Sequence, residues 1–271
     1  MSTTMKQLTT EQLQTFQQDG YLVIRGLLAP TEVEALINNF MQMHAQGPIP
    51  GFFEPVSAEQ ANGDILKQYP RIMHPHRFND MALRYLLDPR LGNILEDLFA
   101  EEPLAAQSML YFKPAGGRGQ ALHQDNFFLR VEPGTCIAAW IALDRVDREN
   151  GGLEVVPGTQ NMGICCPEEA DEAVSFTKDY VPIPAGLQAV PVNMEPGDVL
   201  FFNGSLVHGS QPNTSRDRYR RSFICHYIGR SSERMSLWYR PILTMNGEEV
   251  TIAENTDGGP CGTEFGMAGP H

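Results

Sequence analysis

A histidine and an aspartate lie two residues apart in the middle of the chain, in the segment ALHQDN at positions 121–126. Side chains two apart on a β-strand point to the same face, so His123 and Asp125 can reach one metal ion from a single strand. His208, in the segment LVHGS at 206–210, is the best candidate for a third ligand. Two histidines and one carboxylate suit a non-haem iron(II) site with open coordination positions. A His-x-Asp triplet is weak evidence alone, so the surrounding sequence has to support this metal site.

The composition narrows the class of protein. The 271 residues carry a net charge of −13, which argues against nucleic acid or an anionic membrane as a partner. Apolar residues make up 42%, which is enough for a folded core. No apolar run approaches the length of a membrane span, and residues 1–18 lack the pattern of a signal peptide. We therefore expect a cytoplasmic protein.

The five cysteines are an odd number without paired spacing, at positions 136, 165, 166, 225 and 261. This pattern argues against a secreted disulfide framework and favours reduced thiols. Cys165 and Cys166 are adjacent, whereas zinc sites ordinarily use spaced pairs such as C-x2-C. We assign no function to either residue.

The elements that must position the metal ligands change in type along the chain. A short helix is predicted from Thr10 to Asp19, a strand over 21–28, a helix from Pro30, a long loop over 46–69 and two short helices within 80–100. After residue 104 the pattern becomes short strands separated by glycine- and proline-rich turns, at 106–112, 136–143, 152–156, 198–202 and 222–228. Such a pattern is typical of a sandwich or a jelly roll. Residues 160–190 are expected to form a loop over one mouth, and the glycine-rich end from Asn255 a mobile tail.

Several motifs occur in a characteristic order. They are YFKP at 111–114, the His-Gln-Asp triplet, AWIALD at 139–144 leading into ENGGLEVVPGT at 149–159, PGDVLFF at 196–202, HGS at 208–210 and RRS at 220–222. Together they resemble the phytanoyl-CoA dioxygenase family of iron(II)- and 2-oxoglutarate-dependent oxygenases. The similarity covers most of the chain, including the Asp-Gly-Tyr opening at 19–21, and is strongest over 107–227.

The resemblance implies a mostly β fold, a double-stranded β-helix (jelly roll) flanked by helices mainly from the N-terminal region. We expect one domain, with a helical part over about 1–103, a jelly-roll core over about 104–230 and a C-terminal tail over 231–271. The resemblance also carries the iron ligands onto His123, Asp125 and His208. It implies iron(II), 2-oxoglutarate and O2 as cofactor and cosubstrates.

The far carboxylate of 2-oxoglutarate needs a counter-charge, and the planar fork of an arginine suits it. The family motif places its arginine first in a basic pair before a strand, which here is Arg220. This chain has one more residue than usual between the histidine and that arginine, so Arg218 and Arg221 remain rivals. By the same resemblance, Ser210 donates its hydroxyl to the same carboxylate.

Further positions follow from the resemblance. Gln107, Met109 and Trp140 match residues that line the cosubstrate, although Trp140 is equally compatible with plain core packing. His74 falls near a basic residue that some relatives place beside the cosubstrate, with an ordinary turn histidine as the alternative.

The expected reaction is oxidative decarboxylation of 2-oxoglutarate to succinate and CO2, coupled to oxidation of a small metabolite or a natural-product intermediate. Related halogenases have a small residue at the position of Asp125, so hydroxylation or another oxidation is favoured over halogenation. A cupin-like metal-dependent hydrolase and a non-catalytic metal-binding sensor on the same fold are the alternatives. The sequence indicates neither the substrate nor the oligomeric state.

Overall fold

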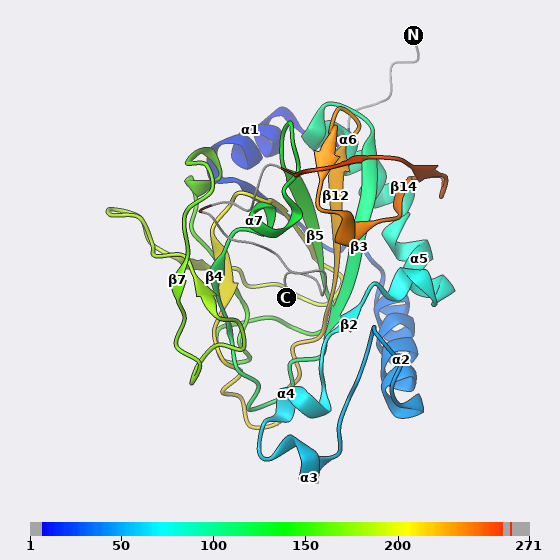
Figure 1. Ribbon diagram of the computed structural model, residues 1–271, viewed down its shortest axis with the longest axis vertical. Coiled ribbons are helices and arrows are strands. Elements are labelled where there is room, and N and C mark those ends of the chain that lie inside the picture. Colours follow the sequence, from blue (N-terminus) through cyan, green and yellow to red (C-terminus); the bar gives the residue numbers. More distant parts are fainter. Residues whose placement is uncertain (1–6, 257–260, 262–271) are drawn as a thin grey trace.

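The N-terminal part of the chain forms helices and two short strands. The computed structural model describes residues 7–256 and Cys261 (Figure 1). Helix α1 (Thr10–Asp19) is capped by Thr9, whose hydroxyl accepts a hydrogen bond from the Gln12 amide at 3.2 Å. Strand β1 (Tyr21–Ile24) and helix α2 (Pro30–Gln46) follow. The next elements are α3 (Ala58–Ala61), α4 (Ile65–Gln68), β2 (Ile72–Met73), η1 (Pro75–Arg77), α5 (Asp80–Leu86) and α6 (Pro89–Phe99).

The rest of the chain consists mainly of strands. The first half contains β3 (Pro103–Tyr111), β4 (Gln120–His123), α7 (Asp125–Leu129), β5 (Cys136–Ala142), β6 (Leu153–Val155), η2 (Thr159–Asn161), β7 (Glu168–Glu169), β8 (Asp179–Tyr180) and β9 (Val190–Pro191). The second half contains β10 (Val199–Asn203), β11 (His208–Ser210), β12 (Ser222–Gly229), β13 (Arg234–Met235), η3 (Leu237–Tyr239), β14 (Ile242–Thr244), β15 (Glu249–Val250) and β16 (Ala253–Glu254).

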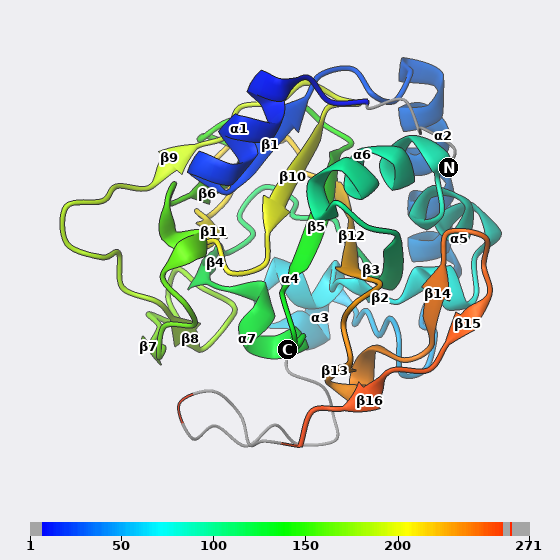
Figure 2. The same cartoon turned by 90° about the horizontal axis from the view of Figure 1, so that it is seen from above.

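Two antiparallel sheets form the body of the molecule. The major sheet has the order β1-β10-β5-β12-β3-β14-β15, with β2 also paired to β3. The minor sheet has the order β4-β11-β6-β9. Strands that are neighbours in space are mostly distant in sequence, as a jelly roll requires. The predicted fold class, a mostly β jelly roll flanked by N-terminal helices, is confirmed (Figures 1 and 2).

The two faces of the major sheet are buried in different surroundings. One face packs against the helices, and its core includes Phe40 of α2, Leu95 of α6, Phe201 of β10 and Phe223 of β12. Helices α1, α2 and α6 lie along this side of the sheet (Figure 2). The alternate residues of the same strands point to the other face, toward the minor sheet. That inner face contains the candidate site.

Several local predictions need correction. The strand expected over 21–28 ends at Ile24. The long loop over 46–69 contains the one-turn helices α3 and α4, which are too short to show a helical period. The segment after residue 230 is more than a tail, because β14 joins the major sheet beside β3. Most of the end expected to be mobile from Asn255 lies outside the described residues.

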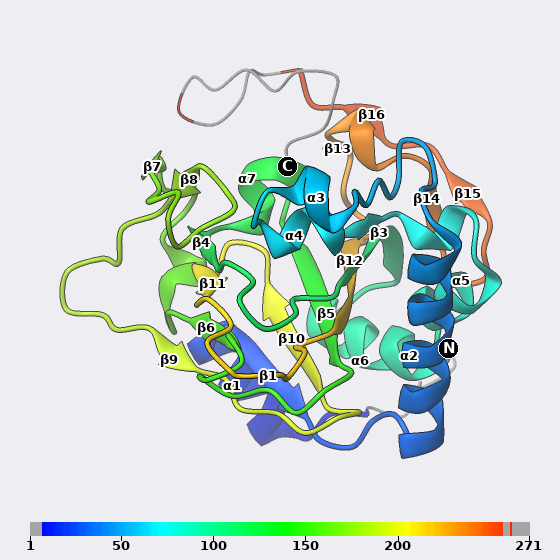
Figure 3. The same ribbon diagram turned by 90° about the horizontal axis from the view of Figure 1, so that it is seen from below.

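The loop predicted over 160–190 is largely irregular, with the small β7–β8 pair inside it. The part between β8 and β9 projects from the body of the molecule (Figures 2 and 3). In the described part of the chain, no helix is long and apolar enough to cross a membrane.

The expectation of wholly reduced thiols is wrong for one pair. Cys166 and Cys261 form a disulfide, while the other three cysteines are free. The bonded pair is separated by 95 residues, so no spacing rule could reveal it in the sequence.

Candidate functional site

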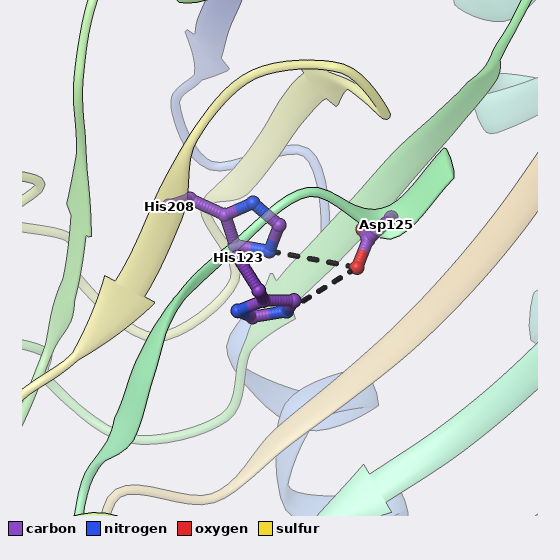
Figure 4. Close-up of side chains that lie close together, drawn as sticks. All are labelled: His123, Asp125 and His208. Carbon is purple, nitrogen blue, oxygen red and sulfur yellow. Dashed lines mark ion pairs between the residues drawn. The ribbon is translucent and has the colours of Figure 1, made fainter. Parts of the chain in front are cut away.

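Three predicted metal ligands meet at one end of the two sheets. His123 ends β4, Asp125 begins α7 and His208 begins β11 (Figure 4). Their candidate ligand atoms all lie within 4.8 Å of one another, and all three side chains are buried. His123 and His208 are direct partners across the β4–β11 pair, which explains how residues 85 positions apart (208 minus 123) meet.

The strand predicted to carry both His123 and Asp125 is shorter than expected. β4 ends at His123, and Asp125 stands in the first turn of α7. Gln124, between them, keeps an extended backbone with φ −123° and ψ 125°, so the two ligands still share one side. The prediction of a shared face therefore holds, although its premise of a single continuous strand does not.

A glycine allows β4 and β11 to approach closely beside the ligands. A Cβ atom on Gly209 would lie 2.8 Å from the carbonyl oxygen of Gln120. That distance is shorter than any real contact of a Cβ atom, so a side chain at position 209 would push the strands apart. The glycine of the HGS motif therefore keeps β4 and β11 close enough to bring the metal ligands together.

The hydrogen bonds of the two histidines orient their rings toward the aspartate. Nδ1 of His123 lies 2.9 Å from the carbonyl oxygen of Ala121, and Nδ1 of His208 lies 3.0 Å from that of Leu206. A carbonyl oxygen only accepts, so both Nδ1 atoms carry the hydrogen and both Nε2 atoms carry a lone pair, which at His123 the Gln120 amide nitrogen approaches to 3.0 Å. The Nε2 atoms lie 3.4 and 3.7 Å from Oδ1 of Asp125 (Figure 4).

The electrostatics give Asp125 and His208 the protonation states that metal binding requires. Burial raises the pKa of Asp125, but the nearby His208 and His226 and the side-chain contacts with His123 and His226 lower it by more, to well below its usual range. Burial lowers the pKa of His208 to about 4, although Asp125 opposes this shift. At neutral pH the carboxylate is ionised and His208 is neutral, as ligands must be.

A fourth histidine supports the carboxylate from β12. Nε2 of His226 lies 2.9 Å from Oδ2 of Asp125, the oxygen that the two ligand histidines do not approach. This contact fixes the orientation of the carboxylate in the manner of an outer-shell partner. The prediction missed His226, although strand alternation from Arg220 through 222 and 224 places it on the inner face.

Arg220 is a buried cation without a carboxylate partner among the described residues. Only 3% of the residue is exposed. Its Nε donates to the Gly151 carbonyl at 3.2 Å and its Nη1 to the Ser222 hydroxyl at 3.0 Å. The guanidinium lies 5.3 Å from the ring of Trp140 and lines the same cavity as the metal cluster. Burial lowers its pKa to about 10, so Arg220 stays charged at neutral pH and requires an anion.

The two rival arginines already have carboxylate partners. Arg218 pairs with Asp147 at 2.8 Å and with Glu149 at 2.7 Å. Arg221 pairs with Asp144 at 2.6 Å. Neither lines the metal cavity, whereas Arg220 does.

Ser210 lines the cavity beside Arg220, and its neighbours determine what its hydroxyl can do. The ammonium of Lys113 donates to Ser210 Oγ at 2.9 Å, and the backbone amide of Gln120 approaches the same oxygen at 3.3 Å. A hydroxyl has two acceptor lone pairs and one hydrogen. With both lone pairs engaged, the hydrogen of Ser210 is left to donate to a third group.

Lys113 belongs to the YFKP motif, but its role was not anticipated. Its residue is 3% exposed, and burial lowers the pKa of its ammonium well below the usual value. The ammonium also donates to the Gly151 carbonyl at 3.0 Å, which Arg220 shares. No sequence pattern could show that a lysine before a proline turns inward, with a positive φ of 36°.

The remaining predicted residues fall into two groups. Met109 and Trp140 line the metal cavity, and Trp140 is nearly fully buried, so it serves the core and the cavity wall together. Gln107 and His74 do not appear among the described residues that line this cavity. Both are buried nearby, and neither side chain has a hydrogen-bond partner among the described residues.

A second cavity opens next to the ligand His123. Its volume is about 250 Å³, and it is bordered by Arg71 from the loop before β2 and by Phe128 of α7. Phe176, Thr177 and Lys178, from the loop before β8, and Asp179 at the start of β8 also line it. The loop predicted over 160–190 therefore borders this cavity at the mouth.

Comparison with known proteins agrees with the fold and shows the family. Residues 16–222 match the family described as phytanoyl-CoA dioxygenase (PhyH). The chain is 27% identical over 238 residues to phytanoyl-CoA dioxygenase 1 of Oryza sativa subsp. japonica, covering 77% of this chain and 85% of that protein. It is 25% identical to the peroxisomal phytanoyl-CoA dioxygenase of Rattus norvegicus, covering 93% of this chain and 77% of the rat protein.

Solved structures of similar fold include two proteins in complex with small molecules. The epimerase SnoN in complex with Fe3+, alpha ketoglutarate and nogalamycin RO has a TM-score of 0.65 and 25% identity, with 85% of each chain covered. EctD from S. alaskensis with 2-oxoglutarate and 5-hydroxyectoine has a TM-score of 0.68 and 21% identity, with 92% of this chain and 88% of that one covered. The chain belongs to the phytanoyl-CoA dioxygenase family of non-haem iron(II)- and 2-oxoglutarate-dependent oxygenases.

Proposed function

We propose that this chain oxidises a small-molecule substrate, by hydroxylation or a related oxidation, while 2-oxoglutarate is converted to succinate and CO2. One observation supports the proposal above all others. A single cavity is lined by a buried cluster of two histidines and a carboxylate and by Arg220, a buried cation without a carboxylate partner in the described part of the chain. A metal cluster and an anion-binding arginine in one cavity suit a dicarboxylate that also chelates the metal.

The metal ligands in this proposal are His123, Asp125 and His208, through Nε2 of each histidine and Oδ1 of the aspartate. Iron(II) with bound 2-oxoglutarate and O2 supplies the oxidising chemistry, and the protein supplies ligation, orientation and a water-poor site. His226 holds the free oxygen of Asp125 and keeps Oδ1 toward the metal position. Because position 125 is a carboxylate, three protein ligands are present, and oxidation is favoured over halogenation.

The far carboxylate of 2-oxoglutarate is assigned to Arg220 and Ser210. The guanidinium makes charge-assisted hydrogen bonds, and the Ser210 hydroxyl has its hydrogen free to donate. Met109 and Trp140 form the apolar wall beside the carbon chain of the cosubstrate. Apolar walls also keep water away from the anion and strengthen its pairing with Arg220.

Two features support a small molecule as the substrate. The cavity at the mouth, about 250 Å³, is of a size for a compact metabolite or for part of a larger natural product. Structural relatives bind such compounds, namely nogalamycin RO in SnoN and 5-hydroxyectoine in EctD. The net charge of −13 gives no support to a highly anionic substrate such as a coenzyme A thioester.

Anaerobic titration followed by a metabolite screen tests the proposal. Iron(II) and 2-oxoglutarate together are expected to give a weak visible charge-transfer band that neither gives alone. Release of succinate above the substrate-free background then identifies substrates. Absence of the band at saturating concentrations, with zinc bound and 2-oxoglutarate not consumed, would instead support the hydrolase or sensor alternatives.

A further inference from the structure

A group of unpaired polar side chains lies beside the metal site, and the assigned roles do not account for it. Seven buried side-chain nitrogen and oxygen atoms of the described residues lack a hydrogen-bond partner. Six of the seven belong to four residues, which we call the distal cluster: His74, Gln107, His226 and Tyr239. All four are at most 2% exposed. Unpaired polar atoms are normally rare and scattered in a protein interior, so this concentration requires an explanation.

Strand register brings the four residues together from distant parts of the sequence. Gln107 of β3 and His226 of β12 are direct cross-strand partners on the inner face. His74 immediately follows β2, whose Met73 pairs with Met109 of β3. The His74 and Tyr239 rings lie 6.5 Å apart. The distal cluster is therefore contiguous, although its members span residues 74 to 239.

The distal cluster touches the metal site through His226. One ring nitrogen of His226 lies 2.9 Å from Asp125, while the other, Nδ1, is among the unpaired atoms. His226 also lines the metal cavity. On the same sheet face Gln107 is followed by Met109 and Tyr111, which line that cavity toward the Arg220 end. The metal cluster thus lies between Arg220 on one side and the distal cluster on the other.

Leaving these groups unpaired costs stability, and the backbone adds to that cost. A buried donor or acceptor without a partner loses its hydration without compensation. His74 has a positive φ of 48°, which a residue other than glycine adopts only at a cost. Costs of this kind that persist in a folded protein are concentrated at functional sites. A ligand that completes the missing hydrogen bonds accounts for both features.

The chemistry of the distal cluster indicates what the ligand offers. The Gln107 amide and the Tyr239 phenol each both donate and accept hydrogen bonds, and no lysine, arginine, aspartate or glutamate belongs to the distal cluster. Burial lowers the pKa of His74 to about 2, so this ring is neutral under working conditions. No member of the distal cluster carries a permanent positive charge to compensate a carboxylate or phosphate; Arg77 and Arg71 act electrostatically on His74 and Tyr239 from outside it. A hydroxyl or carboxamide group, which also donates and accepts, matches the set.

We propose that the distal cluster is a substrate subsite that binds an uncharged hydroxyl- or carboxamide-bearing part of the substrate beside the metal. This inference rests on the proposed function, because it names the class of compound that the oxygenase accepts. It predicts that Gln107 and Tyr239 determine substrate affinity, whereas Arg220 determines cosubstrate affinity. The subsite also orients the substrate from the Asp125 side of the metal.

Thermal unfolding without ligand separates a binding role from a structural one. Tyr239→Phe removes a hydroxyl that has no hydrogen-bond partner within residues 7–256, so its melting temperature is expected to equal or exceed that of the wild type. The matched control is Tyr227→Phe on β12, whose hydroxyl donates to the Leu86 carbonyl at 2.7 Å on the helix-covered side. The control is expected to melt at a lower temperature. An equal loss in both variants would mean that the Tyr239 hydroxyl is structural and would overturn the proposal.

Fragment binding tests the chemical class directly. Acetamide and glycerol are the uncharged probes, and acetate and inorganic phosphate are the anionic ones. Each is titrated by ligand-observed NMR into protein loaded with zinc in place of iron and with 2-oxoglutarate. An uncharged probe is expected to bind the wild type and Tyr227→Phe equally, and at least tenfold more weakly to Gln107→Leu and Tyr239→Phe. Preference for an anion, or binding that neither distal variant changes, would overturn the proposal.

The 2-oxoglutarate dissociation constant, measured in the same variants, keeps this inference separate from the proposed function. Tyr239→Phe, at a residue with no assigned role toward the cosubstrate, is expected to bind 2-oxoglutarate within about twofold of the wild type. If 2-oxoglutarate binds to none of the proteins while the uncharged fragments still depend on the distal residues, the proposed function fails and the subsite remains. If 2-oxoglutarate binds normally and no fragment depends on the distal residues, the subsite fails and the proposed function remains.

Discussion

The two ends of the inner sheet face differ in whether their buried polar groups have hydrogen-bond partners. At the Arg220 end, Ser210 and Lys113 are held by hydrogen bonds, and the guanidinium is already anchored to the Gly151 carbonyl. At the other end, the distal cluster keeps six polar atoms without partners among the described residues. The two ends are separated by only a few residues along β3 and β12.

This difference suggests that the Arg220 end binds one fixed ligand, whereas the other end discriminates among possible substrates. Every turnover uses the same dicarboxylate, so a preformed clamp with a fixed positive charge lowers the entropic cost of binding it. In the proposed substrate subsite, buried polar groups instead gain their hydrogen-bond partners only when the substrate binds. Such a division gives affinity at one end and selectivity at the other, because a compound that leaves buried groups unpaired is rejected.

The largest expected effect comes from the metal ligands, which both ends share. His123→Ala or Asp125→Ala is expected to abolish iron-dependent formation of succinate, since two ligands cannot hold the metal in a productive geometry. Cooperative thermal unfolding is expected to persist, because the ligands lie on a cavity wall and outside the apolar core clusters. Full activity in either variant would refute the metal assignment.

The Arg220 end gives the next largest effect. Removal of the guanidinium leaves a desolvated carboxylate unpaired, at a cost of about 2–5 kcal/mol. Arg220→Ala is therefore expected to raise the 2-oxoglutarate dissociation constant by roughly thirtyfold or more, with little change in iron affinity. Arg221→Ala is the matched control and is expected to change cosubstrate binding by less than about 1 kcal/mol, because Arg221 pairs with Asp144. The reverse outcome would place the clamp one residue later.

His74 of the distal cluster is expected to make the free energy of unfolding fall at acidic pH. His74 has a pKa near 6.5 when unfolded and about 2 when folded, so below pH 6.5 only the unfolded chain takes up this proton. Stability contributed by this residue therefore falls as the pH falls, by about 2 kcal/mol between pH 6.5 and 5. His74→Asn, which tolerates the positive φ, is expected to flatten the pH profile measured by chemical denaturation. Parallel profiles for wild type and variant would refute this account of His74.

The smallest effect concerns the coupling within the Arg220 end. If Lys113 acts on the cosubstrate by directing the Ser210 hydroxyl, then Lys113→Met and Ser210→Ala should weaken 2-oxoglutarate binding by non-additive amounts. A double-mutant cycle is expected to give a coupling of about 1 kcal/mol, typical of groups in direct contact. Additive losses would show that Lys113 acts independently of Ser210. Unfolding curves for Lys113→Met check that the variant remains folded.

Much of the fold and the metal site could be predicted from local pattern. The helices starting at Thr10 and Pro30 follow from capping and from proline at the first turn, and their starts match the structure. The order of the motifs identified the family, and the spacing of His123 and Asp125 predicted ligands on one side. The family motif favoured Arg220 and left Arg218 and Arg221 as rivals, and the structure separates them because both rivals pair with carboxylates.

Other features depended on contacts between distant segments, which no local pattern contains. The disulfide between Cys166 and Cys261, the inward turn of Lys113 and the support of Asp125 by His226 are examples. The distal cluster is another, since only the register of β3 with β12 and the positions of β2 and η3 bring its four residues together. A sequence specifies which groups are available and which face of a strand they occupy. The tertiary structure decides which of those groups remain unpaired once the interior is packed, because burial and hydrogen bonding depend on neighbours from the whole chain.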